Sequence, residues 1–123
     1  MNTKRRQHAC FVDEATSSIH VIGGYDGEVY NRLQSTEKWL FGTYSWQPSA
    51  NLPEKIIGSR AVSANSNEYV GYMAGGTVRY RYTSKVWGLR RKDMTWIEMS
   101  QKLKTGRLHH SLLNVPMDKV LGC

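Results

Sequence analysis

Tyrosine and arginine side chains, the residue types best suited to recognition chemistry in this 123-residue sequence, gather in two short segments. Each segment follows a pair of adjacent glycines, and together the two contain Tyr25, Asp26, Tyr30, Arg32, Arg79, Tyr80 and Arg81. A tyrosine ring buries a large amphipathic area at an interface, and a guanidinium can grip a carboxylate through two parallel hydrogen bonds. We therefore predict that these segments are loops that bind a partner protein or an acidic peptide. The alternative, in which they are ordinary solvated loop side chains, stays open.

The other reactive side chains lack the spacing of a catalytic or metal site. His109 and His110 are adjacent, so on a strand they would point to opposite faces and could not hold one ion together. Cys10 and Cys123 are far apart, at no metal-binding or redox spacing. The sequence also contains no Cys–His dyad, no cluster of paired carboxylates and no phosphate-cradling loop. We expect no enzymatic activity, no cofactor and no metal site.

The charge of the chain permits a second kind of partner. Net charge is +7, from 17 Lys and Arg against 10 Asp and Glu, which allows weak attraction to polyanions. Basic residues are densest in one stretch without acidic residues: Arg79, Arg81, Lys85, Arg90, Arg91 and Lys92. Tyr80 and Tyr82 alternate with two of them, a pattern suited to stacking on single-stranded nucleic acid. This stretch should be divided between opposite ends of the strands, so nucleic-acid binding is the less favoured alternative.

A repeat positions these segments. The glycine doublet Gly23-Gly24 returns at Gly75-Gly76 (75 − 23 = 52), and Trp46 returns as Trp96 (96 − 46 = 50). A third copy opens at Arg107, which aligns with Arg60 when the two arginines are taken as equivalent. A period of about 50 residues is typical of four-stranded propeller blades.

Short β-branched and aromatic runs separated by turn residues predict an all-β chain with four strands in each full copy. The first copy has expected strands at 7–12, 19–22, 35–41 and 45–50, and the second at 60–64, 68–74, 84–89 and 95–99. Residues 108–114 are expected to form the first strand of the third copy. No helical pattern interrupts these runs, so each copy should be a small antiparallel sheet.

The order of residues resembles that of the kelch repeats. The resemblance is carried by Gly23-Gly24-Tyr25-Asp26-Gly27, by Ser35-Thr36-Glu37-Lys38-Trp39, by Trp46 and by Leu52-Pro53, and it covers nearly the whole chain. The sequence departs from the kelch pattern at Trp39, where tyrosine is usual, and at Leu89, seven residues before Trp96. The resemblance implies an incomplete kelch-type β-propeller, with one four-stranded blade at 5–53, another at 54–104 and part of a third at 105–123.

Several residues have structural roles in this interpretation. The doublets Gly23-Gly24 and Gly75-Gly76 should allow positive φ or a close backbone approach. Trp46 and Trp96 should wedge between successive blades and belong to the core, and Trp39 belongs to the repeat signature. Two and a half blades also leave apolar faces uncovered, which predicts self-assembly through those faces.

The resemblance further implies a function. Many kelch proteins are substrate adaptors of ubiquitin ligases or associate with actin, and their ligands often face the residue after the glycine doublet and the arginine that opens a repeat. By that resemblance, Tyr25 and the arginines Arg6, Arg60 and Arg107 are expected to face a partner. Some kelch propellers are oxidases or epimerases, so a propeller enzyme remnant is a further alternative. No signal peptide and no membrane-spanning run is predicted, and the thiols suit a cytoplasmic protein.

Overall fold

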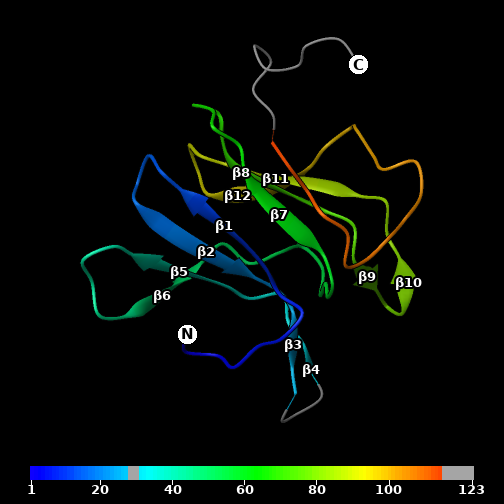
Figure 1. Cartoon of the computed structure of the whole chain (residues 1–123), viewed down its shortest axis with the longest axis horizontal. Helices are drawn as coiled ribbons and strands as arrows, with labels where there is room; N and C mark the ends of the chain where they lie inside the picture. Colours follow the sequence, from blue (N-terminus) through cyan, green and yellow to red (C-terminus); the bar gives the residue numbers. More distant parts are fainter. Residues whose placement is uncertain (28–30, 115–123) are drawn as a thin grey trace.

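The computed structural model describes residues 1–27 and 31–114, and these residues form an all-β protein (Figure 1). It contains two four-stranded antiparallel sheets and two small two-stranded sheets. The two larger sheets stand side by side, with β1 against β7, and do not close into a ring (Figure 1).

The two four-stranded sheets have the same topology. The first has the order β1-β2-β5-β6 and the second has the equivalent order β7-β8-β11-β12. Their strands are β1 (Ala9–Asp13), β2 (Ser18–Ile22), β5 (Thr36–Leu40), β6 (Trp46–Ser49), β7 (Arg60–Ser63), β8 (Tyr69–Ala74), β11 (Val86–Arg90) and β12 (Thr95–Glu98). Each lies within two residues of the strand expected from the sequence, which confirms the predicted pair of antiparallel sheets.

The segments after the glycine doublets are short hairpins, where the sequence predicted loops. β3 (Tyr25–Asp26) pairs with β4 (Asn31–Arg32), and β9 (Thr77–Val78) pairs with β10 (Arg81–Tyr82). Figure 1 shows both hairpins at the same end of the molecule. In each copy an isolated bridge ties the first hairpin strand to the chain before the sheet, Arg6 with Tyr25 and Ile57 with Thr77.

All four doublet glycines have positive φ, from +60° to +96°. They also lie against neighbouring backbone. A Cβ on Gly24 would stand 2.8 Å from the carbonyl oxygen of Arg6, and one on Gly76 would stand 2.7 Å from that of Ile57. Because of both properties, any residue type other than glycine would be strained at these positions.

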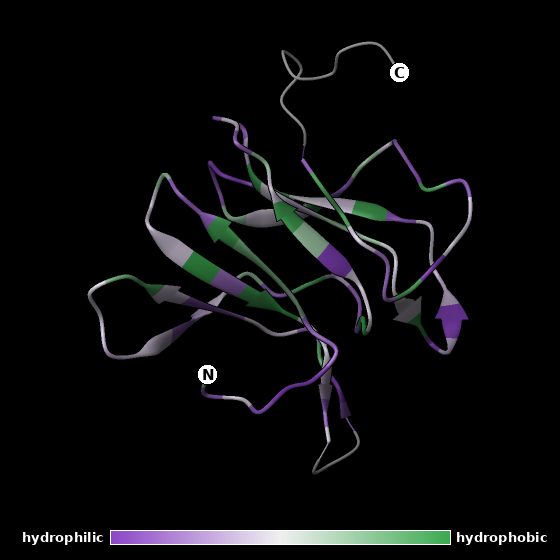
Figure 2. Ribbon diagram, in the orientation of Figure 1, coloured by the Kyte–Doolittle hydropathy of each residue, from purple (hydrophilic) through white to green (hydrophobic). Residues whose placement is uncertain are grey.

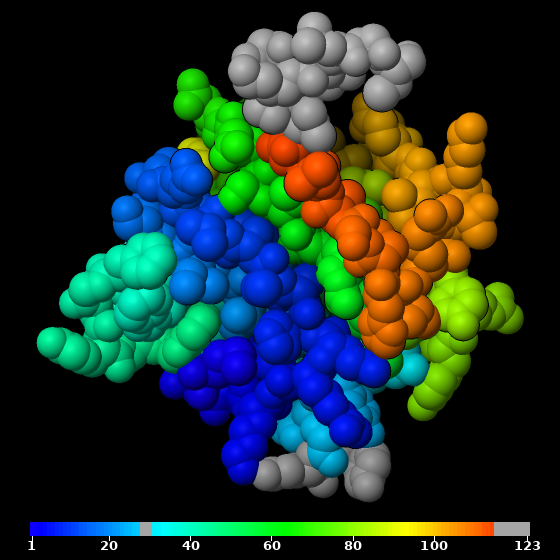
Figure 3. Space-filling view, viewed as in Figure 1, coloured from blue at the N-terminus to red at the C-terminus, as the bar shows by residue number. Residues whose placement is uncertain are grey.

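The third copy differs from its prediction. Residues 108–114 form no strand, because they find no strand partner in the described part of the chain. They run along β7, as Figure 3 shows, where the His109 amide donates to Gly58 O at 2.9 Å. Residues 115–123 of this copy lie outside the described residues.

The alignment of Arg107 with Arg60 is also wrong. The Gly24 amide donates to Ile56 O at 2.9 Å, and the Gly76 amide donates to Arg107 O at 2.7 Å. These bonds make Arg107 the equivalent of Ile56 (107 − 56 = 51). The backbone bonds therefore define a register of the third copy that the arginine pattern missed.

The core lies between the two sheets. Figure 2 shows the apolar stretches of β1, β2, β7 and β8 gathered at the centre of the molecule. The Phe11 ring packs on Gly71, where a Cβ would stand 2.7 Å from the ring. Trp96 crosses between the copies, since its indole Nε1 donates to Ala50 O at 3.0 Å and the residue is 6% exposed. This position matches the predicted wedge.

The prediction that Trp46 is a core residue is wrong. Trp46 is only partly buried, because within the described residues no further sheet packs on its side of the first sheet. Trp39 is also partly buried, with its ring edge-on to Phe41 at 4.9 Å. Trp87, which the sequence analysis did not single out, is 1% exposed and belongs to the core.

Two buried positions hold charged side chains in the first copy and apolar side chains in the second. In the first copy the buried Arg5, which precedes β1, donates to Glu37 at 2.6 Å and to Gly23 O at 2.9 Å. The equivalent residues of the second copy are Ile56 (56 − 5 = 51) and Trp87 (87 − 37 = 50), both in the apolar core. Burial alone would raise the pKa of Glu37, but hydrogen bonds from Asn2, Arg5 and Thr3 lower it. Because a buried ion pair repays its desolvation only when fully hydrogen-bonded, this pair depends on the N-terminal segment.

Gly76→Ala should destabilise the fold more than Gly42→Ala, although both glycines have positive φ. No atom lies within 4 Å of the position that a Cβ on Gly42 would take, so its substitution should cost only backbone strain, about 1–2 kcal/mol. The clash with Ile57 O should add about 1–3 kcal/mol at Gly76. Urea unfolding of the two variants measures this difference, and equal losses would contradict the close approach.

His20 should make stability fall in mild acid. Burial lowers the pKa of His20 from 6.5 to about 4, and its ring stacks on Phe11 at 4.9 Å. Its contribution is therefore fully present above pH 6.5 and is lost as the pH falls toward 4, by roughly 3 kcal/mol in all. His20→Phe should flatten the dependence of unfolding free energy on pH across that window.

The control is the exposed His109, replaced by the glutamine that occupies the equivalent position 7 of the first copy. His109→Gln should leave the slope unchanged. An unaltered slope in His20→Phe would contradict the assignment.

Candidate functional site

The two hairpins are neighbours because both copies hold them in the same way. Each hairpin closes on its glycine doublet, through Leu33 N to Gly24 O and through Thr83 N to Gly76 O, each at 2.9 Å. The linker between the copies joins the first hairpin, since the Gly24 amide bonds to Ile56 O. The hairpins therefore leave the same end of adjacent sheets.

A cation–π contact connects the two hairpins. The guanidinium carbon of Arg32, on β4, lies 4.1 Å from the ring centroid of Tyr80, in the β9–β10 turn. The Nη1 atom of Arg32 is sealed from solvent and has no hydrogen-bond partner among residues 1–27 and 31–114. A buried guanidinium nitrogen without a partner is uncommon, and this one is closed off from solvent within the contact between the hairpins.

Two hollows in the surface adjoin this contact. One hollow of about 410 Å³ and another of about 430 Å³ share Arg32, Lys55 and Tyr80. We call the two together the hairpin groove, which is lined by Tyr25, Asn31, Arg32, Gln34, Glu54, Lys55, Ile57, Val78, Arg79 and Tyr80. Each hollow lies within the size range of small-ligand sites.

The hairpin groove is basic. Arg32, Lys55 and Arg79 line it with one carboxylate, that of Glu54. Glu54 accepts from Lys85 at 3.1 Å, and this hydrogen bond raises the pKa of Lys85. Among the described residues, Lys85 thereby neutralises the one acidic side chain that lines the groove, which leaves an excess of positive charge.

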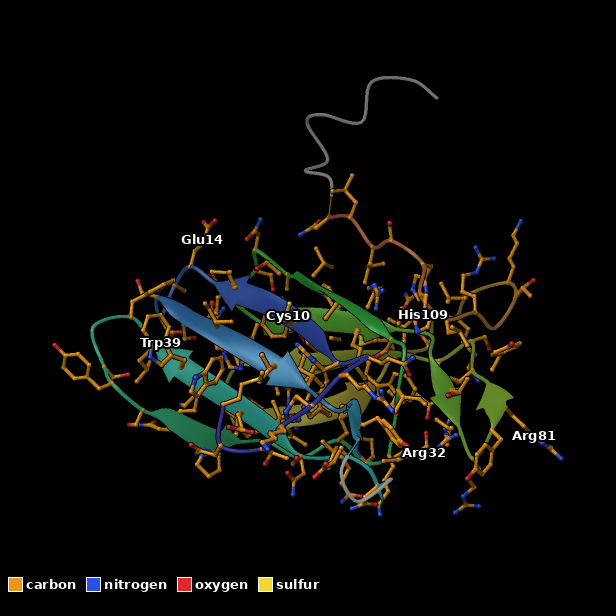
Figure 4. All side chains as sticks on the ribbon, turned by 60° about the horizontal axis from the view of Figure 1, so that its bottom comes forward. Cys10, Glu14, Arg32, Trp39, Arg81 and His109 are labelled. Atoms are coloured by element: carbon orange, nitrogen blue, oxygen red, sulfur yellow. The ribbon has the colours of Figure 1, made fainter. Side chains whose placement is uncertain are left out.

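Four of the predicted partner-binding residues come together in the groove: Tyr25, Arg32, Arg79 and Tyr80. Asp26 lies beside Tyr25 but lines a separate hollow with the N-terminal segment. Arg81 is exposed on β10, at the same end of the molecule as Arg32 (Figure 4). Tyr30 lies outside the described residues.

Arg60 and Arg107 are not in the groove. They lie near His8 and His110 instead, in the innermost segments of the copies. Burial lowers the pKa of His110, and the charges of Arg107 and Arg60 lower it further. These arginines follow the packing of the inner segments and form no common site with the hairpins. Arg6, by contrast, stacks on Tyr25 at 4.8 Å and so adjoins the groove.

The sequence analysis missed Lys55 and Glu54. Both lie in the linker after Leu52-Pro53, a place where charged residues are ordinary. Their position depends on the bond between Gly24 and Ile56, which draws the linker across the base of the first hairpin. No signal in the sequence would have found them.

The turn of the second hairpin is strained. Arg79 and Tyr80 have φ values of +47° and +68°, in a two-residue turn between β9 and β10. Positive φ at both positions is the feature of a type I′ turn, which strongly favours Asn-Gly. Two bulky residues in this conformation cost of order 1–2 kcal/mol each, and such strain is commonly retained at functional sites.

No group of three or more His, Cys, Asp and Glu side chains in residues 1–27 and 31–114 is placed to hold a metal ion. No helix in that part of the chain has the length and apolar character to cross a bilayer. Arg90 and Lys92 lie at or beyond the end of β11 opposite the hairpins, so the basic stretch is divided as predicted.

No protein-family model matches the chain, and no curated protein matches it.

Replacing Arg79 and Tyr80 together by Asn and Gly should stabilise the fold by about 1 kcal/mol. The substitution relieves the strain at both positions and loses the stack on Arg32, which is worth about 0.5–1 kcal/mol at an exposed site. Urea unfolding measures the change. A loss of 1 kcal/mol or more would show that the turn is not strained as described.

Proposed function

We propose that this chain is a non-catalytic, kelch-type protein-interaction module that binds an acidic segment of a partner protein in the hairpin groove. The observation that carries the proposal is the convergence of Arg32, Lys55 and Arg79 beside tyrosine rings, from two successive copies. Arginine and tyrosine dominate the energetics of protein interfaces. Basic clusters of this kind are also used to recognise acidic motifs.

The repeated sheets support the kelch interpretation. Both copies place a glycine doublet after the second strand, a hairpin after the doublet and a tryptophan on the fourth strand. An incomplete kelch propeller, with two blades and the first segment of a third, accounts for this order. Through the same resemblance, a role as a ubiquitin-ligase substrate adaptor or an actin-associated protein is part of the proposal.

The groove suits a carboxylate in geometry as well as charge. Tyr80 stacks on the Arg32 guanidinium at 4.1 Å, and both side chains line the two hollows of the groove. A hydrogen bond to a charged group contributes about 1.5–3 kcal/mol. An extended peptide lying between the hairpins would bring such groups to Arg32 and, further along, to Lys55 or Arg79.

A fluorescein-labelled decapeptide rich in glutamate should bind the protein, and the double variant Arg32→Ala, Lys55→Ala should bind it at least tenfold more weakly. Fluorescence anisotropy at 150 mM salt measures both affinities. The matched control is Lys92→Ala, which removes a positive charge beyond the opposite end of β11 and should leave affinity unchanged. Equal losses in the control would show that only net charge matters, and tighter binding of a single-stranded oligonucleotide would favour the nucleic-acid alternative.

A further inference from the structure

We infer that the preferred ligand of the hairpin groove is a phosphate monoester carried on a peptide side chain. The inference rests on the proposed function and names the chemical group that the groove selects. It comes from the number and the arrangement of the cationic groups.

Three cations reach the groove from three separate backbone segments. Arg32 comes from β4, Lys55 from the linker between the copies, and Arg79 from the β9–β10 turn. A carboxylate is planar, carries one charge and is saturated by one guanidinium fork. A phosphate monoester carries about −1.5 to −2 charges at pH 7 and presents three acceptor oxygens in a tetrahedral arrangement. Donors from three directions therefore match the phosphate better.

The donors are also available. Arg32 is partly exposed and forms no ion pair among the described residues, and Lys55 is exposed and makes one 3.3 Å hydrogen bond to Asn31. Arg79 is exposed and takes part in none of the ion pairs among the described residues. A ligand would gain these groups without breaking an internal salt bridge.

Lys85 sets the charge of the groove without lining it. It pairs with Glu54 at 3.1 Å and with Glu98 at 3.5 Å, and so offsets the charge of Glu54, the one carboxylate that lines the groove in residues 1–27 and 31–114. If Lys85 were neutral, the free Glu54 carboxylate would repel a dianion more than a monoanion. Lys85 is thus a positioning residue, and its removal should reduce the preference for phosphate over carboxylate.

The other basic cluster offers no equivalent site. Arg60 and Arg107 lie near His8 and His110, but both ring nitrogens of His110 and the Nδ1 atom of His8 are sealed from solvent. None of the hollows described above is lined by these side chains. An anion could not reach them without displacing the inner segments.

The test compares three labelled peptides that differ at one central position, which is phosphoserine, glutamate or serine. Anisotropy titrations use the full chain, the wild-type sequence first. We expect the phosphoserine peptide to bind at least tenfold more tightly than the glutamate peptide.

The groups that face the ligand are Arg32, Lys55, Arg79, Glu54 with its partner Lys85, and the tyrosines Tyr25 and Tyr80, and no histidine lines the groove. Because the second phosphate ionisation lies near pH 6, phosphopeptide affinity should rise severalfold from pH 5.5 to 7, whereas glutamate-peptide affinity should stay level.

Two variants separate the groove from general charge. Lys85→Met should reduce the ratio of phosphoserine to glutamate affinity at least threefold. Lys102→Met removes the same charge at a residue whose ion pair within the described part of the chain is with Glu98, at 3.9 Å, and should leave the ratio unchanged. Circular dichroism checks that both variants remain folded.

Each outcome decides the inference. Equal affinity for phosphoserine and glutamate, with both lost in Arg32→Ala, would overturn the phosphate preference and leave the proposed function intact. No binding of any peptide would overturn both. Competition by inorganic phosphate at the concentration of the peptide would show that the groove takes the free anion, which contradicts a peptide ligand.

Discussion

The hydrogen bond from the second glycine of each doublet to the chain of the next copy is the contact on which the rest of the structure depends. Gly24 bonds to Ile56, and Gly76 bonds to Arg107. The same two carbonyl oxygens lie too close to the first glycine of each doublet for a Cβ, at 2.8 Å for Gly23 and 2.5 Å for Gly75, and both glycines of each doublet have positive φ. The two bonds link successive copies at the point where each hairpin leaves its sheet, so the packing of the sheets and the placement of the hairpins share one cause.

The candidate site follows from this link. The first bond draws the linker across the base of the first hairpin and thereby brings Lys55 to the groove. The common topology of the two sheets sends the second hairpin from the same end, where Tyr80 meets Arg32. No single copy contains the groove, because each supplies only one wall. Under the proposed function, the groove accounts for the strained turn at Arg79 and Tyr80, which would be more stable with Asn-Gly.

Local patterns in the sequence were sufficient to predict the eight sheet strands and the positions of the glycine doublets. The alternation of apolar and polar residues and the choice of turn residues both depend on neighbours in the sequence, so they could be recognised from the sequence alone. Burial was less predictable: Trp46 and Trp96 share one repeat position, yet only Trp96 has a sheet packed against it. The strand predicted in the third copy does not form for a similar reason. Residues 108–114 have a strand-like composition, but no strand in the described part of the chain pairs with them. Lys55 and Glu54 belong to the site through a long-range backbone bond, which no local pattern encodes.

Amide hydrogen exchange at Gly24 and Gly76, measured by NMR on the native protein, tests the central link most directly. Both glycines follow strands, and in a simple loop their amides would exchange with solvent. If each donates to the chain of the next copy, both should exchange as slowly as the paired amides in the middle of β2 and β8. Exchange of both at the rate of exposed turn amides would contradict the account, because the copies would then lack the bond that aligns their hairpins.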